Sequence, residues 1–275
     1  MTATATATAT ATRRPAPALS PATRWLARVL VPAALVVAWW FGSAGSTSPY
    51  YPPLAEIVTR FRELWLFEQV RSDVVPTLVV LFSGLLIGVA LGVVGGLGLA
   101  RMPTVRATVM PLITFYRALP GIALIPVLVQ LFGYGDGVRV GMVVLVALPP
   151  TLIATMDGVL GLDATLSDVV RAYGLPRSER LLGVYLPVAG PQVFAGVQVS
   201  MQFAFIAAIA VEMVGSTRGI GYQTLLAQQT FASADMWAGV LLLGVVGFGS
   251  SAVVRLVRNR LLRWYDGAQA VSRAA

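Results

Sequence analysis

The residues of this chain that could act on a small charged molecule are a few polar side chains inside long apolar segments. Arg117 lies within one of these segments, and a charge inside a membrane is costly enough to be functional by default. Its guanidinium group could draw an anion along a water-filled path. The polar companions that we assign to the same path are Gln130, Gln198, Gln202 and Glu212.

Each of these residues also has a structural interpretation, and the sequence leaves both open. Gln198 and Gln202 are one helical turn apart and share a helix face, where their carboxamides could instead bond to a neighbouring helix. Arg117 could extend its side chain toward the inner headgroups. Glu212 lies at the external end of its apolar segment, where it could form a gating contact or cap the following turn, and we favour the cap.

The composition excludes most enzymatic chemistry. The 275 residues contain no His and no Cys, which rules out disulfides, thiolate nucleophiles, histidine bases and the usual zinc sites. All 20 basic residues are Arg, so the chain lacks the lysine of a P-loop, and no other glycine-rich phosphate-binding signature is present. We therefore expect no enzymatic activity and no cofactor, and any ATP-driven work would require a partner that binds ATP.

The apolar content indicates an all-α protein that crosses a membrane several times. Hydrophobic residues make up 57% of the chain, charged residues make up 12%, and the mean hydropathy is +0.78. A membrane span needs about 20 apolar residues. The sequence therefore predicts about six spans, near residues 25–45, 76–100, 107–133, 139–160, 187–211 and 237–257.

Glycine and proline add predictions for three of these spans. The span at 76–100 has glycines that allow close contact with neighbouring helices, at positions 84, 88, 92, 95, 96 and 98. The spans at 107–133 and 139–160 contain prolines, and we therefore expect kinked or broken helices in both.

The arginines predict the orientation of the spans. With the N-terminus inside, the arginines of the external segments are Arg60, Arg62, Arg71, Arg139 and Arg218. Apart from Arg117, the others, Arg255 among them, fall on the cytoplasmic side, as the positive-inside rule requires. Both termini and the 161–186 loop are therefore predicted to be cytoplasmic. Because the arginines lie at span ends, the net charge of +8 reflects topology, and we expect the lipid bilayer rather than nucleic acid as a partner.

The rest of the chain divides into tails and a covering helix. Residues 1–23, a Thr-Ala alternation followed by a Pro-rich stretch, are predicted to be a disordered cytoplasmic tail. Residues 24–267 form the membrane domain, and residues 268–275 form a short C-terminal tail. Aromatic residues at the end of the first span favour a retained helix over a cleaved signal peptide. The segment 52–75 has apolar residues at helical spacing and is predicted to cover the external end of the bundle.

The predicted cytoplasmic loop has the signals of two short helices that meet at a glycine. Asp163 is a suitable N-cap for a helix that continues through Tyr173. Gly174 supplies the left-handed position that ends this helix, and Pro176 suits the first turn of the next one. Such a pair of helices could insert into a groove on a soluble partner.

The same loop carries a spaced motif. Asp168-Val169-Val170 is followed by three residues, Gly174, nine residues and then Val184-Tyr185-Leu186-Pro187. This pattern resembles the Glu-Ala-Ala, Gly, Ile-x-Leu-Pro signature of the membrane permease subunits of bacterial ABC importers, with conservative replacements. The segments 117–126 and 219–222 are similar to the nitrate, sulfonate and taurine branch of that family.

The resemblance implies an importer-permease bundle in the bacterial plasma membrane, with a cytoplasmic coupling helix. It implies that two ABC ATPase subunits bind ATP and dock on the loop. It also implies a second permease subunit, most simply a homodimer partner, and an external solute-binding protein that delivers the substrate. The residues that would couple to the ATPase are Asp168, Arg171, Ala172, Gly174, Arg177, Glu179, Leu186 and Pro187.

The expected function is the import of a small anionic solute such as a sulfonate, nitrate or taurine. One alternative is an ion-coupled secondary carrier that needs no ATPase. Such carriers place acidic residues near the midplane, whereas Asp157, Asp163 and Glu212 fall at span ends here. A second alternative, within the same family, is a permease for a vitamin precursor such as a pyrimidine.

Overall fold

The structure, a computed structural model, describes residues 21–265 and residue 267. Within these residues the chain forms helices and short connections without a strand, which confirms the all-α prediction. The helices are α1 (Pro21–Ser43), α2 (Leu54–Glu63), α3 (Val75–Arg101), α4 (Pro103–Ala118), α5 (Ile125–Phe132), α6 (Asp136–Leu160), α7 (Ala164–Ala172), α8 (Arg177–Glu179), α9 (Leu186–Gly215), α10 (Ile220–Gln229) and α11 (Ser233–Leu261). Short helical turns are η1 (Leu64–Glu68), η2 (Val70–Val74), η3 (Gly121–Leu124) and η4 (Arg180–Tyr185).

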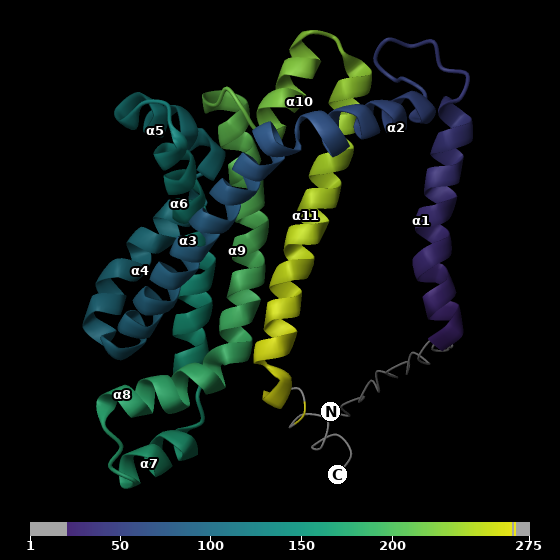
Figure 1. The fold of residues 1–275 in the computed structure, drawn as a ribbon. Helices are drawn as coiled ribbons and strands as arrows, with labels where there is room; N and C mark the ends of the chain where they lie inside the picture. The colour runs from purple at the N-terminus through teal and green to yellow at the C-terminus, as the bar shows by residue number, and fades with distance from the viewer. Residues whose placement is uncertain (1–20, 266, 268–275) are drawn as a thin grey trace, which may run out of the picture.

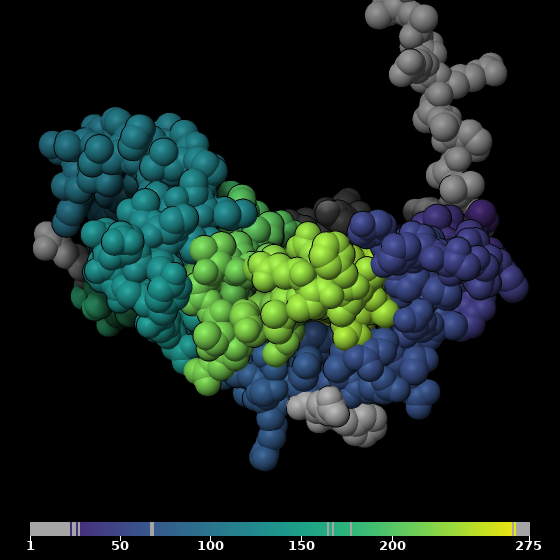
Figure 2. Space-filling view, turned by 90° about the horizontal axis from the view of Figure 1, so that it is seen from above, coloured from purple at the N-terminus to yellow at the C-terminus, as the bar shows by residue number. Residues whose placement is uncertain are grey.

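The long helices run between two end layers (Figure 1). Helices α2 and α10 lie across one end of the bundle, and α7 and α8 lie across the other. Helix α1 stands apart from the bundle, and in Figure 2 the α10–α11 region lies between α1 and the α5–α6 region. The beginning of α1 and the end of α11 are both at the α7–α8 end, an arrangement that matches the predicted placement of the 161–186 loop on the side of both termini (Figure 1).

Four helical segments of the described residues are long and apolar enough to cross a membrane, namely Val70–Arg101, Asp136–Leu160, Arg180–Gly215 and Ser233–Leu261. The pair formed by α4 and η3–α5 would make a fifth, and it is bent by 91°. This bend confirms the break predicted from the prolines of the third span. The apolar part of α1, Arg28–Ser43, is shorter than these segments, so six spans remain a prediction.

Helix α6 is continuous through Pro149 and Pro150, so of the kink or break predicted for this span the break is absent. A proline inside a helix leaves the carbonyl four residues earlier without its amide donor. For Pro149 that carbonyl belongs to Leu145, and the hydroxyl of Tyr116 on α4 donates a hydrogen bond to it at 3.0 Å. A neighbouring helix thus supplies the missing donor, as membrane bundles require.

Glycines on one face of α3 allow α6 to pack very closely. Gly84, Gly88, Gly92 and Gly96 recur once per turn and all face α6. A Cβ atom at Gly92 would lie 2.9 Å from the carbonyl oxygen of Leu148, and one at Gly96 would lie 2.5 Å from that of Leu152. The prediction of close helix contact is confirmed at these four positions, where small residues let the two backbones meet.

The end of the bundle that carries α2 and α10 is closed by an apolar cluster. Leu54 and Ile57 of α2 and Trp65 of η1 pack against Ile220 of α10 and Leu242 of α11. This packing confirms that the segment 52–75 covers the bundle. Residues 1–20 of the predicted tail 1–23 and the C-terminal tail of residues 268–275 lie outside the described residues. Residues 21–23 are not tail, because α1 begins at Pro21.

Candidate functional site

The α7–α8 loop, residues 161–186, is built as its sequence signals predict. The Asp163 carboxylate accepts a hydrogen bond from the Thr165 amide at 3.0 Å and so caps α7. Helix α7 ends at Ala172, and Gly174 adopts the left-handed conformation with φ +65°. The Arg180 amide then donates to the carbonyl of Pro176 at 3.0 Å, which starts the next helical segment. The three local predictions for this loop are confirmed.

Most of the motif side chains on this loop face outward. Asp168 and Arg171 are exposed and form an ion pair at 3.3 Å, which contributes little to stability because solvent screens it. Tyr173, next to the glycine, is 79% exposed. Ala172 and Glu179 are also exposed, whereas Leu186 and Pro187 are half-buried at the start of α9, and Arg177 begins α8. The loop therefore presents a mixed surface, in which charged side chains lie beside the exposed Tyr173, Val169 and Leu182.

Gln198 and Gln202 line one small pocket between α9 and α11, which confirms that they share a helix face. The pocket has a volume of about 220 Å³, and its other lining residues are Met201, Ser251, Val254 and Arg255. Neither Arg117 nor Gln130 lines it. Arg117 is exposed in the last turn of α4, and Gln130 is exposed on α5.

Arg255 lies inside α11 rather than beyond its end, although the sequence grouped it with the cytoplasmic arginines. The Leu262 side chain, just past α11, would be 3.2 Å from a Cβ atom at Gly190, so α11 ends level with that residue of α9. Arg255 is level with Gln198, about 16 Å along α9 from Pro187 at a rise of about 1.5 Å per residue.

Glu212 is fully buried in a hydrogen-bonded network at the opposite end of the bundle. Its carboxylate accepts from the Thr77 hydroxyl at 2.7 Å and from the Gly221 amide at 3.0 Å, and it pairs with the Arg139 guanidinium. Gly221 is in the first turn of α10, so Glu212 has the capping contact that was one of its two sequence interpretations. Gly219, at φ +117°, leaves no room for a side chain beside that carboxylate.

Other charged groups extend this network toward solvent. The buried Asp73 carboxylate accepts from the Gly219 amide at 2.8 Å. Asp136 accepts from Arg139 at 2.8 Å and from the exposed Arg218 at 2.6 Å. Asp136, Arg139, Arg218 and the connection after α9 line an open pocket of about 570 Å³. The network joins α3, α6, α9 and α10 into one corner.

Sequence reasoning missed Arg139 as the partner of Glu212. It placed Arg139 in an external segment, whereas the side chain is only 3% exposed and sits between two carboxylates. Removing one member of such a buried pair costs about 3–5 kcal/mol, because the remaining charge stays uncompensated. The only signal in the sequence was that a buried carboxylate at position 212 needs a positive partner.

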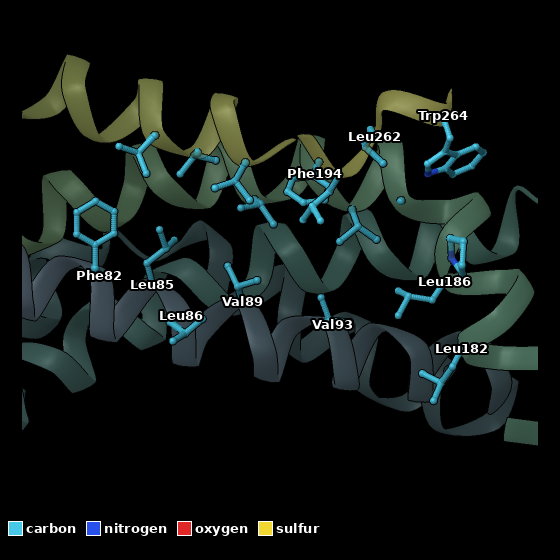
Figure 3. A pocket seen from close by; sticks show the side chains of 18 residues that line it. Phe82, Leu85, Leu86, Val89, Val93, Leu182, Leu186, Phe194, Leu262 and Trp264 are labelled. Carbon is cyan, nitrogen blue, oxygen red and sulfur yellow. The ribbon is translucent and has the colours of Figure 1, made fainter. Parts of the chain in front are cut away.

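One cavity between the long helices has an apolar lining. It has a volume of about 710 Å³ and lies between α3, η4, α9 and α11. Figure 3 shows Phe82, Leu85 and Val89 of α3 on one side, with Phe194 of α9 and Leu262 across from them. Aliphatic and aromatic groups cannot orient an ion, so this groove suits lipid chains or another apolar helix better than a polar solute.

Residues 84–265 match the sequence profile of a family described as the inner membrane component of binding-protein-dependent transport systems. The matched segment includes the α7–α8 loop, the Gln198 pocket and most of the Glu212 network. A solved structure of a methionine ABC transporter, MetNI, in inward-facing conformations has a similar fold. Its TM-score is 0.63 at 19% identity, and the match covers 72% of this chain and 97% of that one.

Three curated relatives are similar over nearly the whole chain. The putative aliphatic sulfonates transport permease of Bacillus subtilis is 28% identical, covering 88% of this chain and 90% of the relative. The taurine transport system permease of Escherichia coli is 25% identical, covering 86% and 89%. The formylaminopyrimidine transport permease of Halalkalibacterium halodurans is 26% identical, covering 84% and 92%.

Proposed function

The chain belongs to the family of inner-membrane components of binding-protein-dependent transport systems, and from this premise we propose that it forms the path for a small anionic solute. It is a multi-pass membrane permease of an ABC importer and not an enzyme. The observation that carries the choice of solute is the likeness, over most of both chains, to permeases named for aliphatic sulfonates and taurine. Nitrate is small and carries the same single negative charge as the sulfonate group, and it belongs to the same proposal.

We propose that two ATPase subunits dock on the α7–α8 loops of a permease dimer. The loop is exposed and preorganised by the Asp163 cap and the Gly174 turn. It lies at the end of the bundle where α1 begins and α11 ends, which is the cytoplasmic end by the arginine distribution (Figure 1). ATP would be bound by these partners, because this chain has no phosphate-binding signature.

We propose that a second copy of the chain faces the exposed side of α9. Val199, Phe203 and Ile206 are between 42% and 52% exposed along that side, and Gln202 lies among them. The path between two such faces would carry Gln198 and Gln202, with Arg117 and Gln130 contributed by α4 and α5. Glu212 is buried, so its contribution would be to hold the external corner rather than to contact the solute. A solute-binding protein would deliver the substrate to that corner.

Uptake into proteoliposomes tests the function. The permease is reconstituted with its ATPase and its binding protein, and uptake of radiolabelled taurine, ethanesulfonate and nitrate is measured with and without ATP. We expect uptake of at least one of these three solutes that requires both ATP and the binding protein. Uptake that persists without ATP would show a secondary carrier. Uptake of formylaminopyrimidine but of no anion would support the pyrimidine alternative, which the Halalkalibacterium relative favours.

The role of Arg117 in the path is tested by Arg117→Gln. If the guanidinium attracts the anion, uptake falls severalfold while membrane abundance and ATPase assembly stay normal. If Arg117 anchors α4 at the headgroups, the abundance of folded protein falls instead. Arg101→Gln, at the exposed end of α3, is the matched control for loss of one arginine. Normal uptake at normal abundance would remove Arg117 from the path.

A further inference from the structure

Four polar side chains converge in the pocket between α9 and α11. Gln198 and Gln202 come from α9, and Ser251 and Arg255 come from α11. Met201 and Val254 form its apolar base, since both are buried and belong to the bundle core. The pocket therefore combines a closed apolar floor with polar groups at its walls.

The pocket lies well inside the bundle along its long axis. Gln198 is about 16 Å along α9 from Pro187 and about 26 Å from Gly215, the other end of the helix. Arg255 is exposed on α11 and lies about 10 Å along that helix from Leu262, where the helix ends. A cation held there is tolerated only if it faces a partner or a water-filled cavity.

Arg255 has no such partner among residues 21–265, since none of the ion pairs in that part of the chain involves it. The other polar groups that line the pocket are two carboxamides and a serine hydroxyl, each of which can turn a hydrogen-bond donor toward a ligand, although each can also accept. The pocket thus offers one positive charge and three neutral donors, with no carboxylate. The ligand that complements this set is an anion with several acceptor oxygens.

We propose that the Arg255 pocket, lined by Gln198, Gln202, Ser251 and Arg255, is a transient binding site for a small oxyanion such as a sulfonate or nitrate. This inference rests on the proposed function, because it places the site on the path of the transported solute. A volume of about 220 Å³ suits an anion of a few heavy atoms and is below the roughly 300–1,000 Å³ of sites for drug-sized ligands.

The pocket opens toward the proposed path. Gln202 is exposed and lies three residues after Val199 and four before Ile206, so it shares the exposed face of α9 with both. A solute on that face can therefore reach Arg255 past Gln202. Only one charge and flexible neutral donors hold the anion, and such a site binds weakly enough to release it again, as conduction requires.

Thiol labelling tests the site without requiring transport. The chain has no cysteine, so Ser251→Cys places a single thiol beside Arg255. The full-length variant in nanodiscs is treated with two methanethiosulfonate reagents of similar size, an anionic sulfonatoethyl compound and a cationic trimethylammonioethyl compound. The ratio of their two labelling rates reports the local charge. We expect Arg255→Gln to lower the anionic-to-cationic ratio by about tenfold or more.

Three further variants make the readout specific. Arg255→Lys should largely preserve the ratio, since it retains the charge. Arg258→Gln, on the same helix but outside the pocket lining, should change it little. Gln202→Cys reports from α9 if Ser251→Cys does not fold. Added ethanesulfonate should slow labelling at either cysteine in the Arg255 protein and lose this effect with Arg255→Gln.

The possible results separate this site from the function on which it rests. Each of three results would overturn the site: a ratio of labelling rates that Arg255→Gln leaves unchanged, thiols that neither reagent labels, or labelling that ethanesulfonate does not slow. If these results accompanied ATP-dependent anion uptake, the function would stand without the site. If the ratio responded as expected but no anion were transported, the site would stand and the proposed function would fail.

Discussion

Replacing Gly174 by valine tests the α7–α8 loop as the docking element for the ATPase. Gly174 has φ +65°, and no atom outside its immediate chain neighbours lies within 4 Å of a Cβ atom built there. A new side chain therefore meets no steric obstacle, and the whole cost comes from the backbone. An L-residue in the left-handed region costs about 1–2 kcal/mol, and a β-branched one is disfavoured further.

The chain can avoid this cost only by changing the backbone at position 174, which changes the direction of the second helical segment. If the substituted valine shifted to an allowed φ, the chain from Arg177 onward would leave its present direction relative to α7. A cost of about 1–2 kcal/mol lowers the population of the docking conformation roughly 5- to 30-fold. We therefore expect the dissociation constant for the ATPase to rise by about the same factor. The bundle should remain folded, because the loop lies outside its core (Figure 1).

The assay is ATPase binding to the reconstituted permease, with uptake and membrane abundance measured on the same samples. Gly183→Val is the matched control, since Gly183 also has open space around it but has no left-handed backbone. Gly174→Asn should retain most binding, because asparagine tolerates the left-handed region. The reasoning is refuted if Gly174→Val binds the ATPase with normal affinity, or if Gly183→Val weakens binding as much.

Three other predictions follow from the topology and the packing. A cysteine at Ser178 should react with an impermeant reagent only from the cytoplasmic side, and labelling from outside intact cells would reverse the orientation. Arg139→Met should destabilise the detergent-solubilised protein by about 3–5 kcal/mol. Combining it with Glu212→Gln should recover part of the loss in thermal unfolding, and strictly additive losses would exclude a direct pair. Gly96→Leu should lower the unfolding temperature far more than Gly98→Leu, since a Cβ at position 96 would meet a backbone oxygen of α6 at 2.5 Å while position 98 is open. Equal effects of the two leucines would contradict the close α3–α6 packing.

Features that depend on near neighbours in the chain could be predicted from the sequence. The Asp163 cap and the left-handed Gly174 are both present, because a cap or a glycine turn is decided within a few residues. The break between α4 and α5 is present for the same reason. The glycine face of α3 could also be anticipated, although its partner helix could not.

Features that depend on distant residues were missed. The amide donor that Pro149 lacks is replaced by the Tyr116 hydroxyl, 29 residues away, which donates a hydrogen bond to the Leu145 carbonyl. Glu212 has its positive partner in Arg139, 73 residues away. Nothing in either local sequence indicates such a pairing, since each depends on which helices pack together and at what height.

The amino-acid sequence alone was enough to predict the class of protein, the family resemblance and the local structure of the α7–α8 loop. Apolar length, composition and capping signals act along the chain and need no knowledge of packing. Only the packed bundle shows that Arg255 stands beside Gln198 and that Arg139 neutralises Glu212. The cause is axial register: the close approach of glycine-lined helices sets the relative height of neighbouring spans, and hydropathy does not encode that height.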